Sequence, residues 1–201
     1  MRQLTQSDLV GIDRQGELSG LSFDGLSLAG RDFSDRVIED CSFSDSVLTD
    51  VRFNASTIRR CQFVGATVQG TSFFGATMED CKMMGLDFTR GTRFGAATFS
   101  KTSFDYAQLR GVDLSNLEFA ECSLLECDMS RADLSNANLV NCDLTDADWT
   151  GATTRSTDLR GSRVRGLDLR TGPYGIVLTP RQALGLVEDL GVLLVEPHED
   201  K

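Results

Sequence analysis

Apolar residues recur at every fifth position along most of this chain. Phenylalanine occupies that position every ten residues from Phe23 to Phe73, and leucine, isoleucine or valine occupies it in between, beginning at Leu28. An α-helix repeats every 3.6 residues and a strand every two, so neither produces this spacing. A chain with a period of five must turn a corner every five residues and coil on itself. The self-similarity therefore predicts a repeat architecture made of stacked units.

The same register extends well beyond the phenylalanines. Apolar centres run in steps of five from Phe23 to Phe88 and again from Phe94 to Leu169, and Thr154 is the one polar residue among them. The residue two positions before a centre is usually small. All six cysteines occupy that position, and we expect them to be buried core residues: Cys41, Cys61, Cys81, Cys122, Cys127 and Cys142. Their spacing contains no Cys-x-x-Cys pair, and the single histidine is His198, so no metal site is predicted.

Segments such as Ala132-Asp133-Leu134-Ser135-Asn136 follow the pattern A(D/N)LxX. This pattern resembles the pentapeptide-repeat family, and the resemblance covers residues 18–170. It implies an all-β fold, a right-handed quadrilateral β-helix in which four pentapeptides make one square coil. Each centre and the small residue two before it would point inward, and successive coils would stack at strand spacing, about 4.8 Å.

The repeat divides the chain into three parts. Residues 1–17 fit the register poorly and are expected to cap the first coil, with a strand or turn over residues 7–12. Residues 18–170 form the predicted β-helix, with a one-residue register break at 89–93, where six positions separate Phe88 from Phe94. Gly91 is the residue expected to adopt unusual backbone angles there. Whether the extra residue makes a bulge or a projecting loop stays open.

Residues 171–201 are predicted to form a helix–strand module. Thr179-Pro180-Arg181-Gln182 has the N-cap, first-turn proline and N3 glutamine of a helix start, and Gly191 marks the end of a helix that runs to about Leu190. A strand is expected over residues 192–195. The apolar residues cover more than one stripe, which favours a two-fold dimer over a thick cap on a monomer. The predicted interface residues are Leu184, Leu186, Val187, Leu190, Val192 and Leu194.

Composition narrows the possible functions. With 30 acidic and 20 basic residues the net charge is −10, which disfavours direct nucleic-acid binding and permits an acidic surface directed at a basic partner. No stretch has the length of a signal peptide or a membrane span, so a cytoplasmic protein without membrane contact is expected. No residues combine into a catalytic constellation. The sequence therefore predicts a protein that is not an enzyme and has no cofactor.

Several surface residues are candidates for partner binding. Glu39-Asp40, Arg59-Arg60 and Glu79-Asp80 are twenty residues apart and should form a ladder of opposite charges. An acidic column is predicted from Asp128, Asp148 and Asp168, and a patch near the register break from Phe74, Met84, Arg90 and Arg93. Other apolar residues at outward positions are Val64, Leu125 and Val140. A basic collar is expected at the end of the repeat, chiefly as a solvated ring that balances nearby acids: Arg155, Arg160, Arg165 and Arg170.

Two segments resemble one group of the family more closely, the quinolone-resistance group that includes the Qnr proteins. Residues 179–192 are similar to its dimerisation module, and residues 81–88 to the point where several members are interrupted by a loop. The resemblance implies a homodimer that binds DNA gyrase or topoisomerase IV, in part by resembling DNA. The hypothesis is a DNA-mimicking protein that modulates type II topoisomerase or protects it from quinolone-type inhibitors. The alternative is a non-catalytic scaffold with an unrelated protein partner.

Overall fold

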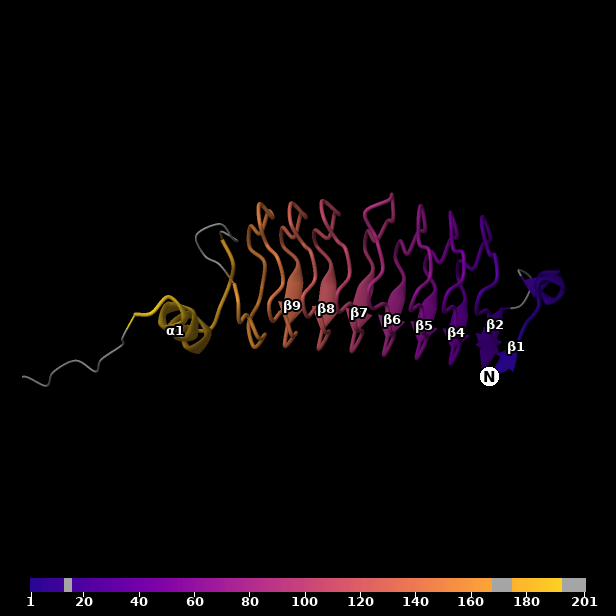
Figure 1. Cartoon of the computed structure of the whole chain (residues 1–201), viewed down its shortest axis with the longest axis horizontal. Helices are drawn as coiled ribbons and strands as arrows, with labels where there is room; N and C mark the ends of the chain where they lie inside the picture. Colours follow the sequence, from indigo (N-terminus) through magenta and orange to yellow (C-terminus); the bar gives the residue numbers. More distant parts are fainter. Residues whose placement is uncertain (13–15, 168–174, 193–201) are drawn as a thin grey trace, which may run out of the picture.

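The computed structural model describes residues 1–12, 16–167 and 175–192, and every structural statement below concerns these ranges. They form a parallel β-solenoid whose coils stack along one long axis (Figure 1). The N-terminus lies at one end of the rod and the helix α1 at the other (Figure 1). The structure therefore confirms the all-β coil architecture that the five-residue period predicts.

One face of the rod is a seven-stranded parallel sheet. Its register pairs Ile38 with Ile58 and Ile58 with Met78, so one coil takes twenty residues. Met78 pairs with Phe99, which adds the one extra residue of the break. In order, the strands are β2 (Glu17–Ser19), β4 (Val37–Glu39), β5 (Thr57–Arg59), β6 (Thr77–Glu79), β7 (Thr98–Ser100), β8 (Glu118–Ala120) and β9 (Asn138–Val140).

The other three faces are joined by single parallel bridges between coils. We number the faces in the order in which the chain passes through them. Face 1 is the sheet, and faces 2, 3 and 4 follow it. Their outward residues begin with Ser22–Ser42 on face 2, Ser27–Val47 on face 3 and Asp32–Arg52 on face 4.

Each corner between faces is a turn with one left-handed residue. The residue two positions after a centre has a positive φ, for example 55° at Asp45 and 74° at Gly65, except after Phe88, where Gly91 takes this conformation in place of Arg90. Glycine, aspartate and asparagine take this conformation at the least cost, and they fill most of these positions. Their recurrence every fifth residue is a second signal of the coil in the sequence.

The aspartate that precedes many centres also shapes the turn. The Asp133 carboxylate accepts a hydrogen bond from the Ser135 amide at 2.9 Å, and the Asp128 carboxylate accepts one from the Ser130 amide at 3.0 Å. An aspartate side chain that bonds the backbone two residues on is a turn-forming device. These bonds give the physical reason for the A(D/N)LxX pattern.

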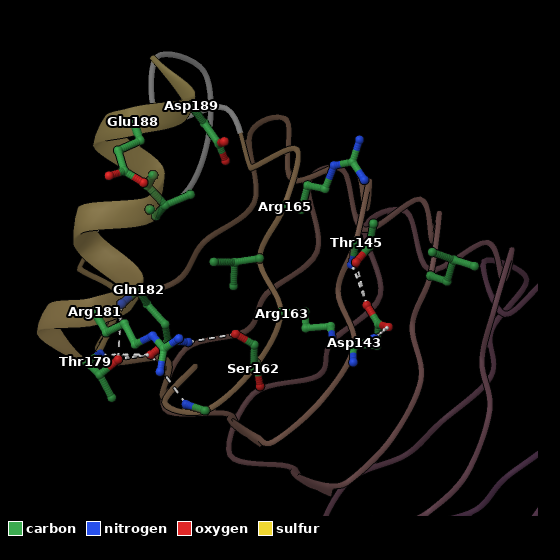
Figure 2. Close-up of a pocket in the computed structure, with 15 residues that line it drawn as sticks. Asp143, Thr145, Ser162, Arg163, Arg165, Thr179, Arg181, Gln182, Glu188 and Asp189 are labelled. Atoms are coloured by element: carbon green, nitrogen blue, oxygen red, sulfur yellow. Dashed lines mark hydrogen bonds and ion pairs between the residues drawn. The ribbon is translucent and has the colours of Figure 1, made fainter. Parts of the chain in front are cut away.

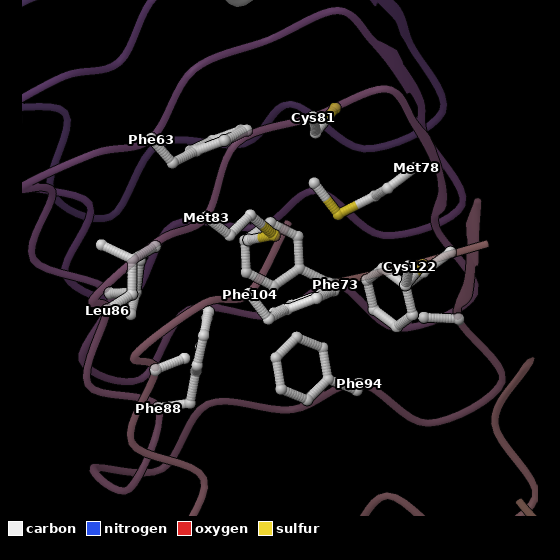
Figure 3. Packing of buried hydrophobic residues seen from close by; sticks show 14 of the residues in the cluster. Phe63, Phe73, Met78, Cys81, Met83, Leu86, Phe88, Phe94, Phe104 and Cys122 are labelled. Atoms are coloured by element: carbon white, nitrogen blue, oxygen red, sulfur yellow. The ribbon is translucent and has the colours of Figure 1, made fainter. Parts of the chain in front are cut away.

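The inward centres form one continuous core. Phe43 stacks on Phe23 at 4.8 Å between ring centroids and on Phe63 at 4.9 Å, while Phe53 from the opposite face meets Phe43 edge-on at 5.7 Å. Figure 3 shows how this packing continues past the register break through Phe88, Phe94 and neighbouring side chains. All six cysteines are free and buried, as predicted.

The register break is a widened turn. Residues 89–91 form a three-residue corner, and Gly91 takes the left-handed conformation with φ of 79°, which confirms its predicted role. On face 3, bridges join Val47 to Thr67 and Asp87 to Gln108, but none is found between Thr67 and Asp87 in the described chain. A notch of about 290 Å³ lies between the two coils there, lined by residues that include Gly65, Asp87 and Arg90.

The N-terminal segment covers the first coil. Strand β1 (Arg2–Gln3) pairs with β3 (Leu21–Ser22), and Leu4, Leu9 and Ile12 are buried. The prediction of a strand or turn over residues 7–12 was incomplete, because a short 3₁₀-helix, η1 (Gln6–Leu9), begins the segment. Its Thr5 cap forms a capping box with Asp8, and this local bonding favours a helical turn over a strand.

At the other end, helix α1 (Pro180–Asp189) closes the rod. Thr179 and Gln182 form the predicted capping box, and Gly191 follows the helix with φ of 78°. The Gln182 amide also donates to the carbonyls of Leu159 and Ser162, at 2.6 and 2.8 Å, which ties the helix to the last coils. The strand expected over residues 192–195 lies outside the described residues apart from Val192. Within the described ranges, no helix is long and apolar enough to cross a membrane.

Candidate protein-binding surfaces

The described residues contain no group of three or more side chains suited to holding a metal ion. An open groove of about 940 Å³ separates α1 from the last coils (Figure 2). Arg163, Arg165 and Arg181 line it together with Asp143, Glu188 and Asp189, and Figure 2 shows both signs of charge along its walls. The charged and apolar surfaces of the rod and its end helix are candidate binding sites, and their charge and exposure decide what they can bind.

The charge ladder forms as the twenty-residue spacing predicts. The Arg59 guanidinium contacts Glu39 at 2.8 Å on one side and Glu79 at 3.4 Å on the other. Arg60 contacts Asp40 at 2.7 Å. All of these groups lie at the surface, where such pairs contribute little to stability. The two arginines of the ladder offset only part of the charge of its four carboxylates, so the ladder keeps a net negative charge.

The acidic column lies on face 3. Bridges place Gln108, Asp128 and Asp148 in successive coils and extend the column back to Asp87, while Asp168 lies outside the described residues. Partial burial of Asp128 raises its pKa, but hydrogen bonds from Ser130 and Arg110 lower it by more, and the net shift is downward. Asp128 is thus ionised at neutral pH, although Arg110 at 2.9 Å offsets part of its charge.

The residues predicted to form a patch near the register break lie on different sides of the rod. Phe74 is 58% exposed at the corner between faces 4 and 1, and Arg93 lies on face 4 beside that corner. Met84 lies at the corner between faces 2 and 3, diagonally opposite Phe74. Arg90 lies in the widened turn between faces 3 and 4, where it contacts Asp87 at 3.2 Å. The prediction that these four residues form a single patch is therefore wrong. Ten residues along the chain make half a coil, so Phe74 and Met84 lie on opposite edges of the rod.

The residues predicted for the dimer interface also differ in where they lie and in how exposed they are. Leu186 is buried against the end of its own rod. Leu184, Leu190 and Val192 are 53%, 52% and 48% exposed, and Val187 is half-buried. Leu194 lies outside the described residues. The cap thus uses one leucine of the helix and leaves an apolar surface free for a second chain.

In the predicted basic collar, Arg160 is paired within its own turn. It contacts Asp158 at 2.6 Å, and this hydrogen bond raises the pKa of the guanidinium. Arg165 lines the groove beside α1. Arg155 is exposed, and Arg170 lies outside the described residues.

Known proteins contain the same five-residue repeat. The profile of pentapeptide repeats matches the chain in eight copies, over residues 89–116, 113–148 and 137–171. The chain is a pentapeptide-repeat protein. The structure carries the same coil back to β2, so the repeat fold extends well before the matched residues. The comparison with curated proteins gave no match.

Solved structures of similar shape include QnrB1, described as a plasmid-mediated fluoroquinolone resistance protein. A trypsin-treated variant of QnrB1 has a TM-score of 0.83 at 22% identity, and the alignment covers 96% of each chain. Full-length QnrB1 has a TM-score of 0.80 at 21% identity and covers 95% of each chain. The pentapeptide-repeat protein and QnrB1 therefore share their fold over nearly their whole length.

Proposed function

We propose that this pentapeptide-repeat protein is a non-catalytic binding protein that acts on a cytoplasmic type II topoisomerase, DNA gyrase or topoisomerase IV. It modulates that enzyme or protects it from quinolone-type inhibitors. The observation that carries the proposal is the likeness to QnrB1, a fluoroquinolone resistance protein, at a TM-score of 0.83 over 96% of both chains.

Electrostatics supports the same proposal. A gyrase surface that grips DNA is basic, and an acidic rod competes for such a surface. B-DNA carries one negative charge per about 1.7 Å, whereas one rung of a column is about 4.8 Å. The column of Asp87, Asp128 and Asp148 therefore copies only part of the charge of DNA. Rod shape and local acidic groups together have to supply the recognition.

A supercoiling assay with purified gyrase tests the proposal. The chain is titrated into the reaction with and without a fluoroquinolone. We expect either inhibition of supercoiling or recovery of activity in the presence of the drug, and both effects should weaken as salt is raised. A folded sample that neither binds gyrase at low salt nor changes supercoiling would refute the proposal.

The alternative is a scaffold for an unrelated protein. Two observations favour it: the register break is a three-residue turn without a projecting loop, and the arginines of the ladder offset part of its acidic charge. A scaffold of this kind predicts no effect in the supercoiling assay, so one experiment separates the two functions.

A further inference from the structure

Four apolar side chains follow one another along the edge where face 2 meets face 3. Val64, Met84 and Leu125 lie one position after the centres of face 2 in their coils. Asp105 holds this position in the coil between Met84 and Leu125, and Tyr106 is the next residue of the same turn. We call the four apolar residues the Tyr106 edge. Val64 is 41% and Tyr106 51% exposed, while Met84 and Leu125 are half-buried. The Tyr106 amide donates to the Leu125 carbonyl at 2.8 Å, which places these two turns directly side by side.

Tyr106 stands in an unfavourable backbone conformation. Its φ is 61°, in the left-handed region, where a bulky residue is uncommon. One coil earlier, Gly85 holds the equivalent turn with φ of 67°. Lys101 and Glu126 take the same conformation at other corners, with φ of 49° and 52°, so the backbone does not set Tyr106 apart. What distinguishes this corner is an aromatic side chain that is 51% exposed.

Carboxylates lie within and beside this edge. Asp105 accepts hydrogen bonds from the Ser103 and Ser123 hydroxyls and from the Leu125 amide, the last at 3.1 Å, so its carboxylate is held in place. Glu126 follows Leu125 at the same corner and is exposed, and Asp128 lies beside it on face 3. An apolar row with carboxylates on its rim complements a protein surface that has apolar side chains surrounded by Lys or Arg.

The notch at the register break adjoins this edge. Gly65 and Gly85, which line it, directly follow Val64 and Met84 in the chain. Its volume of about 290 Å³ is enough for an apolar side chain of a partner. Buried anchors of this kind, beside aromatic residues, supply much of the affinity of protein interfaces.

We propose that the Tyr106 edge is a protein-docking surface whose partner presents apolar side chains flanked by basic ones. The inference rests on the proposed function only in the choice of gyrase as the first partner to test. Phe74 provides a matched control, because it is an aromatic residue of similar exposure, 58%, on the diagonally opposite corner.

The first experiment measures gyrase binding and stability of the same full-length variants. Tyr106→Gly should keep or raise the urea midpoint, because it relieves the left-handed strain, and should weaken gyrase binding by about tenfold or more. Leu125→Thr should also weaken binding while folding normally, since Thr145 occupies the equivalent position one coil later. Phe74→Ala should bind like the wild type. Unchanged binding by Tyr106→Gly, with gyrase bound by the wild type, would overturn the inference and leave the proposed function standing.

A second experiment needs no gyrase. The full-length chain carries isotope-labelled methionine methyl groups and is titrated at low salt with a short amphipathic peptide of leucine and lysine. The Met84 methyl signal should shift saturably, the signal of buried Met78 should not, and Tyr106→Gly should abolish the shift. A folded sample in which the Met84 signal stays unchanged at saturating peptide would overturn the inference even if gyrase binding fails for other reasons.

Discussion

Replacing Phe63 with alanine tests the inward register most directly. The Phe63 ring has no solvent exposure, stacks on Phe43 at 4.9 Å, and meets Phe53 and Phe73 edge-on at 6.0 and 6.3 Å. Truncation of a buried phenylalanine costs about 3–5 kcal/mol, and the three aromatic contacts place this site near the upper end, about 4–5 kcal/mol. Loss of one buried thiol in Cys61→Ala should cost about 1 kcal/mol, because little apolar surface is removed.

Urea denaturation of both variants tests this expected difference in stability. The free energy of unfolding is measured by far-ultraviolet circular dichroism at one protein concentration, because association would make stability depend on concentration. Fluorescence of Trp149, which is buried in the last third of the chain, checks that the rod unfolds as one unit. Equal losses for Phe63→Ala and Cys61→Ala would refute the assignment of large centres and small flanking residues to one packed core.

Three further predictions concern association, pH and partner binding. Leu184→Asp or Leu190→Asp should convert the predicted dimer to a monomer without loss of β-type circular dichroism; a wild type already monomeric by light scattering at micromolar concentration would contradict the dimer. Hydrogen bonds from Ser34 and then Arg52 lower the pKa of Asp32 to about 2. The pKa of this carboxyl is about 3.9 in the unfolded chain, so its ionised form stabilises the folded protein above that pH, and the stabilisation is lost as pH falls. The urea midpoint should therefore drop between about pH 4 and pH 2, and it should drop less in Asp32→Asn. Asp128→Asn combined with Asp148→Asn should slow gyrase association and flatten its salt dependence, measured by surface plasmon resonance, and an unchanged rate would exclude the acidic column from recognition.

Several features of the fold could be derived from residue spacing alone. The five-residue period identifies the inward centres, the position of the cysteines assigns them to the core, and the six-residue step at Phe88 locates the widened turn. These inferences succeed because each coil contacts only its neighbours, so a local repeat is enough to specify long-range contacts. Helix α1 was also predictable, since its capping box and Gly191 lie within the helix ends themselves.

The surfaces were harder to predict. Phe74 and Met84 are ten residues apart in the sequence but lie on opposite edges, whereas Met84 and Tyr106 are further apart in the sequence and share an edge. The predicted patch failed because it counted distance along the chain rather than around the coil. Spacing by twenty, with one residue added at the break, leads from Met84 to Asp105, which directly precedes Tyr106 in the same turn.

The amino-acid sequence by itself determined the coil, because period, residue size and turn chemistry all act within a few residues. Only the tertiary structure decided how the ends and edges are used. It buries Leu186 and leaves Leu184 exposed, opens a notch where the widened turn separates two coils, and brings an apolar row beside fixed carboxylates. These features depend on how the helix packs against the last coils and how far one coil is displaced from the next. Both are set by contacts between residues that lie far apart in the sequence, so a local sequence pattern does not reveal them.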